Sequence, residues 1–72
     1  MDISPAQCRA ARALLNWTQE TLAVKTGVAL KTIRAFENGR TKPLGVTRAA
    51  IKQALEKAGI EFFPDDGLRL KK

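Results

Sequence analysis

The sequence predicts a small, mainly α-helical fold class: a compact set of four helices followed by a short C-terminal β-strand pair or hairpin. Up to Ala58, apolar residues recur at helical spacing between caps and glycines, which indicates short helices joined by tight turns. After Gly59 the pattern changes to two short segments, residues 60–63 and 68–71, in which apolar residues alternate with polar ones. Between them lie residues 64–67, PDDG, whose composition is typical of a turn. A chain of 72 residues is near the lower size limit for one self-supporting core.

The first helix has a clear start signal. Residues 4–7, SPAQ, combine a capping box with proline at the first helical position. Ile3 and Cys8 are spaced as a hydrophobic staple, which favours a structural role for this cysteine over a redox role. The helix is expected to reach Leu15, with Asn16 as a left-handed terminator. Three apolar residues are expected to face inward: Ala11, Leu14 and Leu15.

The next two helices are short. Thr18 is the expected cap of the second helix, which ends at Gly27 after two turns. The third helix is expected over about residues 30–38, with Ile33 and Phe36 inward.

A fourth helix follows the break at Pro43 and Gly45 and is expected over about residues 46–58. Its expected apolar stripe consists of Val46, Ala50, Ala54, Leu55 and Ala58. We therefore divide the chain into a helical domain, residues 1–59, and a strand or hairpin tail, residues 60–72.

Positive charge is concentrated in the first part of the chain. The formal net charge is +6, of which residues 1–48 carry +5 and residues 49–72 only +1. This asymmetry indicates a surface that faces a polyanion and a separate structural or pairing region. The alternative is that the cations only keep the protein soluble.

The composition argues against several other functions. There is no histidine, and the single cysteine has no histidine to pair with, so neither general-base catalysis nor a metal cluster is expected. Gly-rich phosphate loops are also absent. We expect no enzyme activity, no metal and no cofactor. No apolar run approaches the ~18 residues of a membrane span, and the N-terminus does not resemble a signal peptide, so we expect a cytoplasmic protein with no membrane partner.

Two short helices joined through Gly27, the second of them basic, form a helix-turn-helix pattern. The segment WTQETLAVKTGVALKTIRAFENGRTKP, residues 17–43, resembles the phage Cro- and repressor-type helix-turn-helix of the xenobiotic-response-element superfamily. The matching positions are Thr18-Gln19, Leu22-Ala23, Gly27-Val28, Thr32-Ile33, Glu37-Asn38-Gly39 and Pro43. QCRAARALLNW and AIKQALEKAGIEFF extend the resemblance to small bacterial regulators, over about residues 3–63. It implies a compact four-helix, phage repressor-like domain with its helix-turn-helix over about residues 18–38.

In that family the third helix lies in the major groove of double-stranded DNA. With Ile33 and Phe36 inward, four residues are placed to read bases: Leu30, Lys31, Arg34 and Ala35. Lysine and arginine suit guanine edges, and leucine and alanine suit a thymine methyl group. Phosphate contacts are expected from Gln19, Thr32, Asn38, Arg40, Thr41 and Lys42. The alternative for each cation is a solvated surface position, and for Leu30 it is inward packing.

Arg12 and Glu37 occupy the positions of a buried ion pair in related repressors. We expect them to clamp the first helix to the end of the third; the alternative is two exposed charges that contribute ~0–1 kcal/mol. The sequence departs from the family at Ala29, where a serine or threonine usually caps the third helix. An uncapped start typically costs ~1 kcal/mol.

Family members of this size normally bind DNA as symmetric dimers on two half-sites. The tail carries more apolar residues than a small domain should expose, so we expect a homodimer that is formed through it, by strand pairing across the two-fold axis. The candidate dimer contacts are Ile60, Phe62, Phe63, Leu68 and Leu70. The alternative is that the tail only folds back onto the core.

The sequence therefore predicts a transcriptional regulator, a repressor or a controller of its own operon. It would bind an inverted-repeat operator, associate with the bacterial nucleoid when bound, and need no small-molecule ligand. A different class of function is an antitoxin or adaptor whose tail binds a partner protein. A non-specific nucleoid protein would account for the charge but not for the ordered helix-turn-helix pattern.

Overall fold

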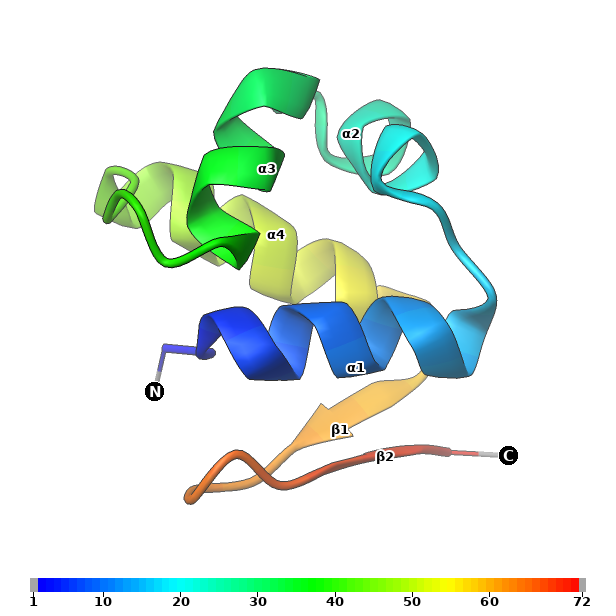
Figure 1. The fold of residues 1–72 in the computed structure, drawn as a ribbon. Helices are drawn as coiled ribbons and strands as arrows, with labels where there is room; N and C mark the ends of the chain where they lie inside the picture. Colours follow the sequence, from blue (N-terminus) through cyan, green and yellow to red (C-terminus); the bar gives the residue numbers. More distant parts are fainter. Residues whose placement is uncertain (1, 72) are drawn as a thin grey trace.

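In the computed structural model, which describes residues 2–71, four helices are followed by two strands (Figure 1). The elements are α1 (Pro5–Leu15), α2 (Gln19–Thr26), α3 (Leu30–Glu37), α4 (Gly45–Lys57), β1 (Ile60–Phe62) and β2 (Leu68–Leu70). In Figure 1, α2 and α3 lie above α1 and the strand pair lies below it. The predicted mainly α fold with a C-terminal hairpin is confirmed. No helix among the described residues is long and apolar enough to cross a membrane.

Local caps set the boundaries of the first two helices. Ser4 Oγ accepts the Gln7 backbone N–H at 3.0 Å, and Gln7 Oε1 accepts the Ser4 N–H at 2.9 Å, which completes the capping box of α1. Asn16 ends α1 in the left-handed region, with a φ of 61°. Thr18 caps α2 with its side chain, and Gly27 ends it with a φ of 73°. The expected ends of both helices are confirmed.

The boundaries of α3 and α4 differ by one residue from the expected positions. α3 ends at Glu37 rather than at residue 38, and α4 spans 45–57 rather than 46–58. Neither helix has a side-chain cap, because Ala29 and Leu44 occupy the N-cap positions. Without a capping side chain, the sequence predicts roughly where a helix starts but does not identify its first residue.

The core forms where the helices and the hairpin meet. Its buried apolar residues come from the four helices, from β1 and from the segment before α1, and the partly buried Leu68 and Leu70 of β2 pack against them. They are Ile3, Cys8, Ala11, Leu22, Ile33, Phe36, Ile51, Leu55, Ile60 and Phe62. The prediction that Leu14 and Val46 face inward is wrong, because Leu14 is 48% exposed and Val46 is 76% exposed.

The geometry of α4 explains the exposure of Val46. The buried residues of this helix are Ile51 and Leu55, one turn apart. At about 100° per residue, Val46 lies about 140° around the helix from Ile51, so it faces solvent. Ala50 and Ala54 lie at the margin of the buried face and are half-buried. The larger side chains of α4, rather than its alanine stripe, define its contact with the core.

The two strands pair as an antiparallel hairpin. Their register is Ile60 with Leu70, Glu61 with Arg69 and Phe62 with Leu68. Asp65 and Asp66 adopt φ values of 62° and 63° in the connecting turn. Both residues are ones that tolerate the left-handed region, as the turn composition of this segment predicts.

Part of the expected dimer contact is wrong. Ile60 is 1% exposed and Phe62 is 8% exposed, because both pack into the core of a single chain. Side chains that are already removed from water within one chain cannot supply contact area to a second. Gln7 of α1 holds the hairpin in place, since its Nε2 donates to the carbonyls of Phe63 and Gly67, each at 2.9 Å. The hairpin therefore folds back onto the helices within one chain.

Candidate nucleic-acid interface

The recognition helix expected from the sequence, α3, has two faces of opposite character. Ile33, Phe36 and Glu37 are 0%, 4% and 1% exposed and attach the helix to the rest of the domain. Lys31 and Arg34 are both exposed. At about 100° per residue, Lys31 lies on the side opposite the buried residues and Arg34 lies beside it. The helix is thus held by one face and offers two cations on the other.

The other predicted contact residues of α3 are partly covered. Leu30, Thr32 and Ala35 are all half-buried. Leu30 lies about 60° around the helix from Ile33, so it sits at the edge of the buried face, and Thr32 lies at the opposite edge. Ala35 is on the outer side, but its small side chain projects little beyond the backbone. The long side chains of Lys31 and Arg34 therefore dominate the outer face.

The Glu37 carboxylate is the centre of a buried hydrogen-bond network. Arg12 donates from Nε to Oε2 and from Nη2 to Oε1, each at 2.7 Å, which makes a bidentate pair. Gln19 Nε2 donates to Oε1 at 3.0 Å, and the Cys8 thiol donates to Oε2 at 3.1 Å. Both carboxylate oxygens thus receive two hydrogen bonds each, which offsets the loss of water around a buried charge.

Arg12 and a second arginine of α1, Arg9, also bond to backbone carbonyls near α2 and α3. Arg12 Nη1 donates to the Trp17 carbonyl at 3.1 Å, just before α2. Arg9 Nη1 donates to the Glu37 carbonyl, where a cation also suits the negative end of the α3 dipole. Because Glu37 is the last residue of α3, these contacts fix the C-terminal end of that helix to α1 and to the start of α2.

The network also sets the protonation of its members. Burial raises the pKa of the Glu37 carboxyl, but hydrogen bonds from Arg12, Gln19 and Cys8 outweigh it, so the pKa lies below its ordinary value. The hydrogen bond to Glu37 raises the pKa of the Arg12 guanidinium. Burial and then the hydrogen bond to Glu37 raise the pKa of the Cys8 thiol. At neutral pH the ion pair is therefore charged, and Cys8 is a neutral thiol donor of low reactivity.

Gln19 has a different environment from the one expected of a phosphate contact. It is the first residue of α2, so its backbone N–H is one of the free donors at a helix N-terminus. Its side chain, however, uses one of its two N–H groups on Glu37. The orientation of the Gln19 side chain is thus set from inside the protein.

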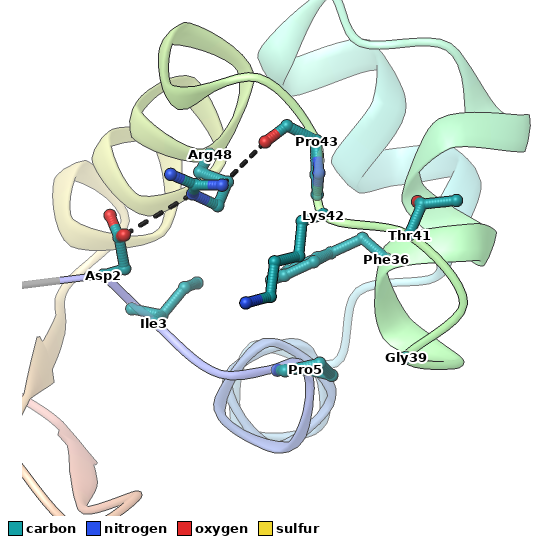
Figure 2. A pocket seen from close by; sticks show the side chains of 9 residues that line it. All are labelled: Asp2, Ile3, Pro5, Phe36, Gly39, Thr41, Lys42, Pro43 and Arg48. Carbon is teal, nitrogen blue, oxygen red and sulfur yellow. Dashed lines mark hydrogen bonds and ion pairs between the residues drawn. The ribbon is translucent and has the colours of Figure 1, made fainter.

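A cationic loop follows α3. Asn38, Arg40, Thr41 and Lys42 are all exposed in it. Figure 2 shows that the Lys42 side chain runs beneath the loop toward the start of α1. An outward contact by Lys42 therefore needs a change of side-chain conformation. Within residues 2–71 no group of three His, Cys, Asp or Glu side chains is arranged to hold a metal ion.

Residues 9–47 match the protein family described as helix-turn-helix. The match covers just over half of the chain and includes α2, α3 and the cationic loop, with Arg12, Gln19 and Glu37 of the buried network. The chain belongs to the Cro- and repressor-type helix-turn-helix family. This family is DNA-binding and non-enzymatic, so the helix-turn-helix protein is a DNA-binding regulator of transcription. No curated protein matches the chain.

Sequence reasoning missed three partners of Glu37 in this helix-turn-helix protein. Cys8 lies one helical turn before Arg12 on α1, and this spacing was a usable signal that both reach the same place. Arg9 and Gln19 gave no such signal, since their contacts with Glu37 join segments 28 and 18 residues apart.

Proposed function

We propose that this helix-turn-helix protein is a repressor or controller that binds an inverted-repeat operator as a homodimer, with α3 in the major groove. The observation that carries the proposal is the pair of faces on α3. The buried Glu37 network fixes the end of the helix, while Lys31 and Arg34 project from its outer face. An anchored helix with exposed cations suits the major groove, which is about 12 Å wide and presents acceptors on guanine.

Base reading is assigned to four residues of α3. Lys31 and Arg34 are the long donors for guanine O6 and N7. Ala35, on the outer side, and Leu30, at the edge of the buried face, are the apolar contacts for a thymine methyl group. We expect a weaker contribution from Leu30, because part of its surface already packs against the protein.

Phosphate contacts are assigned to the groups that flank α3. Gln19 offers its backbone N–H at the start of α2 and its remaining side-chain N–H. The other phosphate contacts, at one edge of α3 and in the loop after it, are Thr32, Asn38, Arg40, Thr41 and Lys42. These groups set the register of the helix on DNA without reading its sequence.

Dimerisation is assigned to the tail residues that stay accessible. Phe63 is 38% exposed, and Leu68 and Leu70 are partly exposed. The Lys71 N–H donates to the Gly59 carbonyl at 2.8 Å. Because bonding groups alternate along an antiparallel strand, the backbone groups of Leu68 and Leu70 point away from β1. Two such β2 edges can pair across a two-fold axis, with Leu68 of one chain opposite Leu70 of the other.

The dimer assignment has a direct test. Replacing Phe63 by glutamate leaves the core residues Ile60 and Phe62 in place, and it is expected to shift the protein toward monomer in sedimentation equilibrium. A Phe63→Glu protein that is as dimeric as the wild type contradicts the assignment.

In this scheme residues 1–59 bind DNA and residues 60–72 contact the second subunit, although both parts share one core.

The function is tested by selecting bound duplexes from a random library with the purified protein at low and near-physiological salt. An inverted repeat that persists at the higher salt supports a dimeric, sequence-specific regulator. Enrichment that disappears with salt and leaves no consensus would show attraction to phosphates alone.

A further inference from the structure

A cavity of about 340 Å³ lies beneath the loop that follows α3 (Figure 2). Ile3, Pro5 and Phe36 form its apolar lining. Two cations, Lys42 and Arg48, line the same space. Its volume is within the range of small-molecule sites in proteins, roughly 300–1,000 Å³.

Arg48 reaches this cavity from the first turn of α4 with part of its hydrogen-bonding capacity unused. Its Nη1 donates to the Pro43 carbonyl at 2.7 Å, which fixes the guanidinium beneath the loop. Its Nε is buried and has no hydrogen-bond acceptor among the described residues. Asp2 Oδ2 lies 3.5 Å from Nε, an ion-pair distance without a hydrogen bond, and the Asp2 side chain is 69% exposed. The Nε donor therefore lacks a well-placed acceptor.

Lys42 adds a second positive charge from the loop after α3. Figure 2 shows its side chain leaving the loop and pointing into the cavity alongside Phe36. Asp2 supplies one carboxylate at the rim against the two cations. The cavity therefore combines an apolar lining with an excess of positive charge.

We propose that this cavity binds a small organic anion, a carboxylate joined to a compact apolar group. The carboxylate takes the place of Asp2, accepts a hydrogen bond from the unused Arg48 Nε–H and pairs with the Lys42 ammonium group. A planar guanidinium matches the geometry of a carboxylate, which favours this ligand over a neutral one. The apolar group lies against Ile3 and Phe36. The sequence gives no sign of this cavity, because its lining comes from separate segments that only folding brings together.

Occupation of the cavity has a consequence for DNA binding, and this part rests on the proposed function. Lys42 is assigned a phosphate contact, but a ligand in the cavity retains its ammonium group beneath the loop. The two anions, ligand and DNA phosphate, compete for one cation. Binding of the ligand therefore weakens the hold of the loop on DNA.

Binding is tested with the full-length, ¹⁵N-labelled protein, titrated with benzoate at constant ionic strength and followed by NMR. We expect saturable shifts of the Gly39 and Lys42 amide signals and of the Arg48 Nε–H signal. Arg48→Gln is expected to weaken binding about ten-fold, and Lys42→Gln about three-fold. Lys57→Gln makes the same charge change at the other end of α4 and should leave binding unchanged.

A second variant and an uncharged ligand show whether binding depends on the charges of the cavity. Arg48→Gln also removes the contact with Pro43, so Lys42→Gln, at an exposed side chain, tests the site without that loss. Benzyl alcohol keeps the ring without the charge and is expected to bind about ten-fold more weakly than benzoate. Equal binding of the two would overturn the proposal. Shifts that chloride reproduces, or shifts that follow protein concentration instead of benzoate, would also overturn it, the latter by assigning the cavity to a second copy of the chain.

The coupling to DNA is tested with a duplex of random sequence. Saturating benzoate is expected to reduce the slope of log affinity against log salt by about 0.9, the share of one phosphate contact. The Lys42→Gln protein should show no such reduction. If benzoate binds and the slope is unchanged, the competition at Lys42 is wrong although the cavity is a ligand site. If benzoate fails to bind while the protein still selects an operator, the cavity proposal fails and the proposed function stands.

Discussion

The two sides of α3 each have an arginine, but the two arginines have different environments: Arg12 of α1 contacts the inner side, whereas Arg34 of α3 lies on the outer side. On the inner side, the Glu37 carboxylate is 1% exposed and pairs with Arg12 through two hydrogen bonds of 2.7 Å. On the outer side, Arg34 and Lys31 are exposed. A partly buried arginine whose hydrogen bonds are satisfied within the chain fixes the position of a helix, whereas an exposed one is available to a partner. Burial, rather than residue type, separates the structural cation from the proposed DNA contacts.

The largest expected effect is a loss of stability when the ion pair on the inner side of α3 is broken. Arg12→Leu leaves the Glu37 carboxylate buried without its counter-ion and is expected to lower the free energy of unfolding by about 3–5 kcal/mol. The Arg12→Leu/Glu37→Leu double variant should lose much less, because no uncompensated charge is left in the core. Urea denaturation monitored by Trp17 fluorescence measures both. A double variant as unstable as the single one would contradict this account of the pair.

The next largest expected effect is a loss of DNA affinity when a cation on the outer face of α3 is removed. Lys31→Ala and Arg34→Ala are each expected to cost about 1–3 kcal/mol in affinity for a selected operator, because each removes a proposed base contact. The free energy of unfolding should change by less than about 0.5 kcal/mol, since both side chains are exposed. Titration of fluorescently labelled duplex measures affinity, and Lys57→Ala is the matched control. An affinity loss equal to that of the control would remove these residues from the interface.

The difference between local and non-local contacts also explains how much the sequence could predict. The start of α1, the ends of α1 and α2, and the turn at Asp65 and Asp66 follow from side chains a few residues apart, so their positions could be predicted. The burial of Phe62 could not, because it depends on a hairpin folding back onto distant helices.

The same limit applies to the candidate site. The cationic face of α3 could be predicted from the spacing of Ile33 and Phe36. The contact of Gln19 with Glu37 and the cavity beside Arg48 join segments whose separation along the chain carries no periodic signal. They are products of packing and were visible only in three dimensions.

A smaller effect concerns the response of the inner face to acid. The folded-state pKa of Glu37 is lowered, so its stabilising contribution is complete above the ordinary value of 4.5 and is lost as the pH falls below it toward the folded-state pKa. The loss from this group is at most about 1.4 kcal/mol per pH unit. Chemical denaturation of wild type and Glu37→Gln across this range isolates it, because the other carboxylates titrate in both proteins. Equal pH dependence of the two proteins would show that Glu37 is not the responsible group.

The smallest expected effect concerns the uncapped start of α3. Ala29 has extended backbone angles, φ −60° and ψ 140°, and is exposed, so a serine there can cap the helix. Ala29→Ser is expected to raise the free energy of unfolding by about 1 kcal/mol. Thermal denaturation compares it with Ala13→Ser, an exposed position inside α1 where serine should stabilise nothing. No gain over the Ala13 control would mean that the start of α3 is not limited by its cap.

The most direct test of the central claim repeats the library selection at near-physiological salt with wild type and with the Lys31→Ala/Arg34→Ala variant. If the outer face of α3 reads bases, the wild type enriches an inverted repeat. The variant should lose preference at the positions that those side chains contact, while it still binds DNA at low salt through its phosphate contacts. Enrichment of the same consensus by both proteins would contradict the claim.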